Sequence, residues 1–318
     1  MLCAETGEAI RPWIQSAHGS LIESGLSGAE ATRLVSQLSV EDDPLGEKFT
    51  LLSFYRLWAD GIDLKVAASR AAELSQDRVT AGSKTRESYK HYRKDLYAQI
   101  LRELGHGQEY YGLDTFIQVS GFLPRNLLIV LKQVTRWALF LGDEPFGAGH
   151  VSLRAQSQGV LEASRWFMSD ATGLGRLGAD SQRSIRRLGE YLAAHRFAEK
   201  PVEVECSQVE VNPQVLTSSS MECLQEAVSH SLLLESGTGR RDRNTGAYHQ
   251  KYQLNPMLSP LFGLPVVRRG CLSLGSSDAN AIFDRDSTDL DFARVRDRRV
   301  ADLRPPFGQM PGQGRLEL

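Results

Sequence analysis

The sequence predicts a mainly α-helical fold that carries a small β-hairpin toward its C-terminal end. Three observations lead to this fold class. Apolar residues recur at helical spacing through most of the first 200 residues. Residues 110–141 read as a short helix, a Gly-Pro break and a longer helix. Strand-like segments occur only between residues 206 and 274.

The composition is that of an ordinary globular protein. The 318 residues give room for two or three small domains, and an apolar share of 41% suffices for their cores. The net charge of −2 gives no overall basic signature of a nucleic-acid protein. The four cysteines are far apart, no secretion signal is recognisable, and the longest apolar runs are much shorter than a membrane span. We therefore expect a cytoplasmic protein with reduced thiols and no membrane contact.

The first predicted domain is a helical region over residues 1–80. Ser27 can cap one of its helices, because Glu30 stands at capping-box spacing from it. Two apolar helices are expected over residues 49–58 and 64–74. Plain helical packing is the favoured interpretation of this region, and a helical insertion that leads to the lid or a remnant that has lost its partner surface are the alternatives.

The second predicted domain covers residues 81–149 and opens with a polar linker over residues 81–88, followed by a helix that Gly105 ends. Its main element is the stretch 110–141. Asp114 can cap the short helix there, Pro124 suits the first position of the longer one, and Gly142 ends it. The residues expected on the buried stripe of the longer helix are Leu127, Leu128, Leu131, Val134, Ala138 and Leu141.

Arg125 is the unusual residue of this stretch. It stands in the first helical turn, where the helix dipole disfavours a cation by roughly 0.3–1 kcal/mol. The same helix end offers unpaired N–H groups that suit an anion. An arginine beside such a site could hold a phosphate, and a solvated surface arginine is the alternative.

The pattern YYGLDTFIQVSGFLPRNLLIVLK resembles the lid segment of origin-recognition-complex-like AAA+ ATPases, in a bacterial branch. In that family, an arginine that opens a lid helix is the sensor-2 residue and reaches the phosphates of the nucleotide. The matching residue here is Arg125. Residues 150–168 and 252–274 are also similar to this branch, and the resemblance covers residues 48–283 in all.

The sequence lacks the nucleotide-binding core that the resemblance implies. No G-x-x-x-x-G-K-[ST] pattern occurs, and no apolar strand ends in paired acids. Residues 81–85, AGSKT, lack the first glycine and follow a polar helical stretch. The chain therefore looks like the lid and C-terminal part of such an ATPase, as a truncated reading frame or a degenerate paralogue. ATP and magnesium are expected only with the missing ATPase core, and the isolated chain is expected to hold no cofactor.

The third predicted domain, residues 150–283, shows helix, strand, helix and hairpin in the order of a winged helix. Residues 231–235 would pair with 248–254, and residues 236–247 would form the wing. From residue 284 onward arginines and aspartates alternate with few apolar residues, so residues 284–318 are expected to be a disordered tail.

Basic residues of the wing and its surroundings could neutralise DNA phosphates. The candidates are Arg240, Arg241 and Arg243 in the wing, with Lys251, Arg268 and Arg269 beside it. Asp242 interrupts the wing, and Glu222 and Glu226 on the preceding helix would repel phosphates. A protein-docking or structural wing is therefore the alternative.

No catalytic or metal site is predicted. The seven histidines are scattered without H-E-x-x-H spacing, and G-x-S-x-G is absent. Residues 173–178 match G-x-G-x-x-G, but a helix precedes them, so a hinge is expected there rather than a dinucleotide site. Whether the chain has an activity is left open, because the family is an ATPase family and this chain alone is expected to have none.

Two functions remain from the sequence. The leading one is the nucleotide-sensing lid and DNA-binding portion of an initiator-like ATPase, which contacts duplex DNA and does not hydrolyse ATP alone. The alternative is a helical adaptor that docks on a separate ATPase core or effector protein and touches neither nucleotide nor DNA.

Overall fold

The computed structural model describes residues 11–146, 149–170, 176–237, 240–241 and 248–307. The protein is mainly α-helical with one small sheet, as the sequence predicts. The chain divides into two compact units. The N-terminal unit contains residues 1–107, 198–201 and 301–318, and the central unit contains residues 108–197 and 202–300. The domain boundaries predicted from the sequence group the chain differently and stay a prediction.

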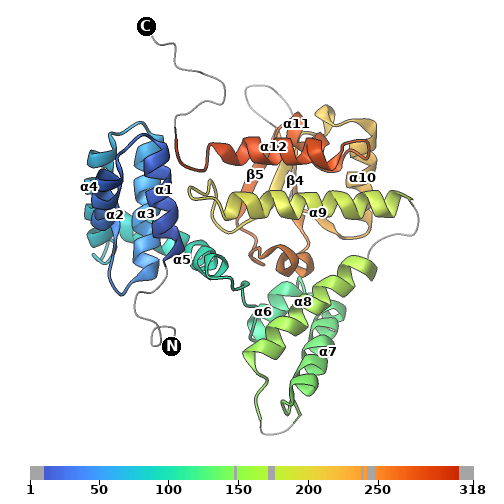
Figure 1. Ribbon diagram of the computed structural model, residues 1–318. Helices are drawn as coiled ribbons and strands as arrows, with labels where there is room; N and C mark the ends of the chain where they lie inside the picture. Colours follow the sequence, from blue (N-terminus) through green and yellow to red (C-terminus); the bar gives the residue numbers. More distant parts are fainter. Residues whose placement is uncertain (1–10, 147–148, 171–175, 238–239, 242–247, 308–318) are drawn as a thin grey trace. The chain divides into compact units, whose positions relative to one another are not determined.

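Among its described residues, the N-terminal unit contains the helices (Figure 1) α1 (Pro12–Glu23), α2 (Gly28–Leu38), α3 (Pro44–Ala59), α4 (Leu64–Asp77) and α5 (Lys84–Glu103). The capping box of Ser27 and Glu30 is present at the start of α2, as predicted. Ser83 caps α5 by accepting a hydrogen bond from the amide of Arg86. The expected linker is therefore shorter than predicted, because α5 already begins at Lys84.

Residues from the far end of the chain complete the core of this unit. The ring of Phe307 lies edge-on to Trp58, at 5.5 Å between centroids, and at 6.0 Å from Tyr55. The carbonyl of Leu303 accepts a hydrogen bond from the amide of Lys200. The unit therefore needs three separate segments of the sequence.

The first part of the central unit consists of α6 (Leu113–Val119), α7 (Pro124–Leu141) and α8 (Leu153–Asp170). Pro124 is the first residue of α7 and Gly142 ends it in the left-handed conformation, as predicted. The predicted cap of α6 is wrong. Gly112, with φ +85°, occupies the N-cap, and Asp114 lies inside the first turn.

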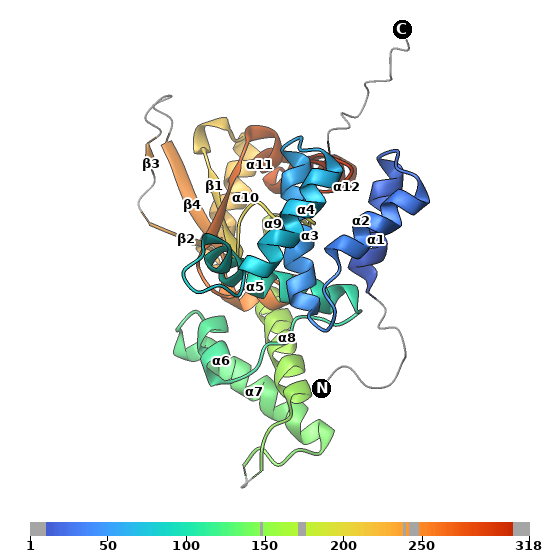
Figure 2. The same ribbon diagram turned by 90° about the vertical axis from the view of Figure 1, so that its left-hand side faces the viewer.

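Helices α7 and α8 run antiparallel and side by side (Figure 2), and a glycine sets their close approach. A Cβ atom added at Gly159 of α8 would lie 2.4 Å from the Cα atom of Val134 of α7. The buried face of α7 consists of Asn126, Val130, Gln133, Val134 and Ala138. Two residues of the predicted stripe, Leu128 and Leu131, are exposed instead.

The rest of the central unit packs helices onto the sheet. The elements are α9 (Arg176–Arg196), β1 (Cys206–Val211), α10 (Ser218–Ser229), β2 (Leu233–Glu235), β3 (Arg240–Arg241), β4 (Tyr248–Leu254) and β5 (Gly270–Leu274), with short 3-10 helices η1 (Pro213–Val215) and η2 (Pro256–Phe262). The strand order is β2-β4-β1-β5, and β3 pairs with β4 alone. The predicted hairpin is confirmed, since β2 and β4 are antiparallel with Leu233 opposite Leu254.

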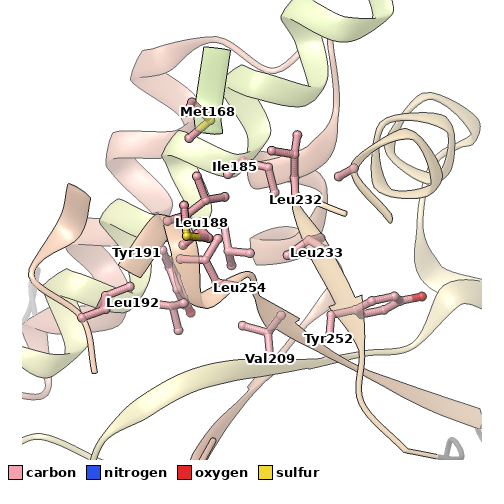
Figure 3. Close-up of a cluster of buried hydrophobic side chains, with 14 of the residues drawn as sticks. Met168, Ile185, Leu188, Tyr191, Leu192, Val209, Leu232, Leu233, Tyr252 and Leu254 are labelled. Carbon is pink, nitrogen blue, oxygen red and sulfur yellow. The ribbon is translucent and has the colours of Figure 1, made fainter. Parts of the chain in front are cut away.

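Alternation along the strands separates a core face from a polar face of the sheet. Val209 of β1 lies opposite Tyr252 of β4 on the core face, whereas Glu210 lies opposite Lys251 on the other. In Figure 3, side chains of α9 point toward the strands, and Ile185, Leu188 and Leu192 are fully buried. Each such side chain contributes about 1.5–3 kcal/mol by its burial.

The chain then forms α11 (Ser276–Phe283) and α12 (Asp289–Ala301), and α12 corrects the prediction of a disordered tail. Figure 1 shows α12 alongside α9. Phe292 and Val300 are its buried anchors. Arg187 of α9, whose side chain is 4% exposed, reaches Asp289 at 2.8 Å. The low content of apolar residues predicts a disordered tail. Two buried side chains and ion pairs to α9 and α11 are nevertheless enough to hold α12 in place. Residues 308–318 lie outside the described part.

No helix among the described residues is long and apolar enough to cross a membrane. The predicted hinge at 173–178 lies largely outside the described residues, and its last glycine, Gly178, belongs to α9.

Candidate functional site

Arg125 is the second residue of α7, and its side chain points into solvent with 80% of its surface exposed. The antiparallel pairing of α7 and α8 brings it to the last residue of α8. Its Nη2 lies 3.6 Å from Oδ2 of Asp170, which is itself half exposed. Such a surface ion pair contributes about 0–1 kcal/mol to stability. Arg125 is therefore free to turn toward another anion at little cost.

The start of α7 lacks a side-chain cap. The turn before it contains Gly121 at φ +63° and Phe122 at φ +62°, a conformation that bulky residues rarely adopt. The buried side chain of Asn126 fixes this turn by donating to the carbonyl of Ser120 at 3.2 Å. Phe122, three residues before Arg125 in the sequence, is exposed. Residues other than glycine that adopt this left-handed conformation cluster at functional sites.

The described residues around Arg125 do not fit a complete site for ATP and magnesium. Phosphoryl transfer needs a backbone cradle, a lysine and metal ligands that together surround the β- and γ-phosphates. Arg125 has one carboxylate beside it, Asp170, which repels phosphate. Among the described residues, no group of three or more metal-ligating side chains lies together. Arg125 can thus supply one contact to a nucleotide, and other groups must supply the rest.

The described cations among the six predicted to contact DNA have different surroundings. Arg240 and Arg241 form β3, opposite His249 and Tyr248 of β4, and Arg243 lies outside the described residues. Lys251 lies on the polar sheet face, where its Nζ is 4.0 Å from Oε2 of Glu210.

Arg268 and Arg269 differ in their contacts. Nη1 of Arg269 lies 2.5 Å from Oε2 of Glu205, a carboxylate with a side chain only 3% exposed. A buried carboxylate needs such a partner, so Arg269 is held in the structure. Arg268 is exposed. On α10, Glu222 forms an ion pair with Arg285 and Glu226 lies 3.1 Å from His230.

Sequence reasoning missed a buried polar network that fastens α12. Asp278 of α11, which is buried, accepts hydrogen bonds from the hydroxyl of Tyr191 at 3.1 Å and from Nε of Arg299 at 2.6 Å. His195 stacks on Tyr191, and burial lowers the pKa of its imidazole. Asp278 is 87 positions from Tyr191 and 21 positions from Arg299, so no local pattern could reveal these bonds.

A family model described as ORC-CDC6-like matches residues 6–274. It therefore spans both the helices of the N-terminal unit and the sheet of the central unit. No curated protein and no solved structure matches the chain. The match covers most of the sequence and agrees with the resemblance carried by the α6–α7 segment. The chain belongs to the ORC-CDC6-like family.

Proposed function

We propose that the protein is the nucleotide-sensing lid and DNA-contacting portion of an initiator-like ATPase. Membership of the family relates the chain to initiator-like AAA+ proteins. The observation that carries the proposal is the start of α7, where an uncapped helix end and an exposed Arg125 face the same solvent. In this proposal Arg125 is the sensor-2 arginine, and α6, α7 and α8 form the lid.

The lid acts together with an ATPase core that supplies the phosphate cradle and the magnesium ligands. Phe122 and Leu123, both exposed next to Arg125, give that core an apolar surface to cover. Without the core, we expect the isolated chain to show no magnesium-dependent ATP hydrolysis above background. Turnover that disappears in Lys84→Ala would contradict this expectation and give the AGSKT segment a catalytic role.

A phosphate probe tests the sensor role directly. Tripolyphosphate should perturb the NMR signals of the Arg125 side chain and of the amides of Arg125 and Asn126, because helix N-termini bind anions. Arg125→Ala should remove these changes, and Arg176→Ala, which alters another exposed arginine, should leave them. Perturbation elsewhere with none at the start of α7 would reject the role.

The DNA-contacting part of the proposal rests on the sheet. The order α9, β1, α10, β2, β4 and the hairpin between β2 and β4 support a winged-helix-like arrangement, with residues 236–247 as the wing. Arg240 and Arg241 would contact phosphates, and exposed Arg268 would extend the patch. Arg269 and Lys251 contribute less, since each already has an acidic partner.

A helical adaptor is the second candidate, and one observation favours it. Many of the exposed large hydrophobic side chains belong to α6, α7, the adjoining loops and the start of α8: Tyr111, Leu113, Phe122, Leu123, Leu128, Leu131, Leu139, Phe140, Phe146 and Leu153. Gathered exposed apolar side chains mark protein-interaction surfaces. Binding to a protein partner that persists without nucleotide or DNA, and in Arg125→Ala, would favour the adaptor over the lid.

A further inference from the structure

The C-terminal half of α7 carries a hollow that the sensor residue does not use. It is lined by Gln133, Arg136, Trp137 and Phe140 of α7 and by Glu162 of α8, with a volume of about 440 Å³. Arg125 and Phe140 are 15 residues apart, which corresponds to about 22 Å along a helix. The hollow is therefore a separate feature from the start of α7.

Aromatic rings form the apolar wall of the hollow. Trp137 and Phe140 meet edge to face with 5.5 Å between ring centroids. Phe140 is 78% exposed, so most of its ring is in water. Exposing a phenyl ring of this size is unfavourable, and aromatic residues in open hollows are typical anchors of protein interfaces.

Helix α7, which supplies most of the lining of the hollow, carries only positive charges. Helix α7 contains Arg125, Lys132 and Arg136 and no carboxylate. In the described part of the chain, neither Lys132 nor Arg136 has a carboxylate within ion-pair distance, and Arg136 donates instead to Oε1 of Gln133 at 3.2 Å. The one acidic residue of the lining, Glu162, already pairs with Arg165 at 3.3 Å. The charge left without an acidic partner on α7, beside the hollow, is therefore positive.

From these observations we infer that the hollow binds an acidic amphipathic helix of a partner protein, which packs one large apolar side chain against the rings of Trp137 and Phe140. Carboxylates flanking that side chain pair with Lys132 and Arg136. Helices commonly bind in this way, with apolar anchors on one face and charges that select the partner.

Other occupants fit the hollow less well. Only two neighbouring helices line it, so a small molecule would stay largely in water, whereas small-molecule sites bury about 70–90% of their ligand. A symmetric dimer through this surface would set cations against cations, because a two-fold interface joins a patch to itself. A flat lipid surface would leave the concave part of the hollow unfilled.

Selection of 20-residue helical peptides from a displayed library against the full chain tests the inference. We expect the selected peptides to be enriched in Asp and Glu around a Leu, Phe or Trp. Phe140→Ser should weaken their binding at least tenfold by fluorescence anisotropy. Leu290→Ser, on α12, removes an equally exposed apolar side chain away from the hollow and should leave the affinity unchanged.

A charge reversal gives the second measurement. The double variant Lys132→Glu, Arg136→Glu should lose the acidic peptides and gain peptides whose carboxylates are changed to Lys. The inference is overturned if selection shows no acidic preference, or if Phe140→Ser leaves binding intact. It is also overturned if Phe140→Ser instead abolishes a concentration-dependent dimer, or abolishes binding to vesicles that contain anionic lipid. The tripolyphosphate experiment on Arg125 reports on the other end of α7. Either test can therefore fail without affecting the result of the other.

Discussion

Two arginines of the central unit differ in burial and in their partners, and therefore in their roles. The side chain of Arg125 is largely exposed, and its carboxylate partner, Asp170, lies 3.6 Å away. Arg187 is buried, donates to the carbonyls of Ala281 and Ser287, and pairs with Asp289. The first is available for a ligand, whereas the second holds α12 against α9.

Substituting each arginine separates these roles. Arg125→Ala should change the free energy of unfolding by at most about 0.5 kcal/mol, because an exposed ion pair and an unfavourable helix-dipole position nearly cancel. Arg187→Ala should cost about 2–4 kcal/mol, because buried carbonyls lose their donor. Urea denaturation of both variants measures the contrast. A loss of several kcal/mol in Arg125→Ala would make that arginine structural and remove the main residue of the sensor proposal.

His195 makes stability depend on pH. Burial lowers the pKa of its imidazole, with Arg299 adding to the effect, while its bond to the Tyr191 carbonyl and the charge of Asp278 oppose it. The folded state therefore favours the neutral ring, and its stability is complete above the unfolded pKa of about 6.5 and falls as the pH drops below it. Urea denaturation at several pH values between 7.5 and 5 measures this effect. As the pH drops, the free energy of unfolding should fall less steeply for His195→Gln than for the wild type. Equal slopes would show that the ring protonates without cost.

At the scale of elements, the contact of α7 with α8 depends on one missing side chain. Gly159 leaves room for the backbone of Val134, which a methyl group would meet at 2.4 Å. Gly159→Ala should lower the free energy of unfolding by about 1–3 kcal/mol through overpacking.

Gly19, inside α1, is the matched control because a Cβ atom there meets nothing within 4 Å. Gly19→Ala should raise stability by up to about 1 kcal/mol, since alanine favours helix more than glycine does. Thermal unfolding of the two variants should move in opposite directions. A neutral Gly159→Ala would show that the two helices can separate slightly at no cost.

Elements with local signals could be predicted, and elements fixed by distant contacts could not. Capping residues, the Pro124 start and the Gly142 end lie within a few positions of the helix ends that they define. The buried face of α7 is different, because this helix has apolar residues on more than one side. Gly159 of α8 selects the Val130–Val134–Ala138 side, and no pattern within α7 shows that choice.

The same reasoning explains what was predictable at the candidate sites. Arg125 was identified from its own neighbours, because a proline and a helix start are local. The different contacts of Arg268 and Arg269 could not be predicted from the sequence. They depend on Glu205, a buried carboxylate more than sixty residues away. Helix α12 was missed for the same reason, because its partners Asp278 and Arg187 lie on other helices.

At the scale of the whole molecule, the proposed wing should bind duplex DNA weakly and without sequence preference. Its arginines contact phosphates, which carry no base identity. Replacing Arg240, Arg241 and Arg243 with Ala should lower the affinity for all duplexes alike, and should flatten the salt dependence by up to about 0.9 per lost phosphate contact. Arg176→Ala, far from the hairpin in sequence, serves as the control. An unchanged salt slope in the triple variant would remove the wing from the interface.

The contribution of Leu303 and Phe307 to the N-terminal unit has a consequence for biosynthesis. On the ribosome, residue 301 follows residue 107 by 194 positions, so at about 5–20 residues per second the first five helices wait about 10–40 seconds for their last segment. During that interval Tyr55 and Trp58 lack the ring of Phe307 that covers them in the finished protein. The nascent N-terminal unit is therefore a natural client for chaperones, and a stop codon near residue 300 would damage the part of the protein that is made first.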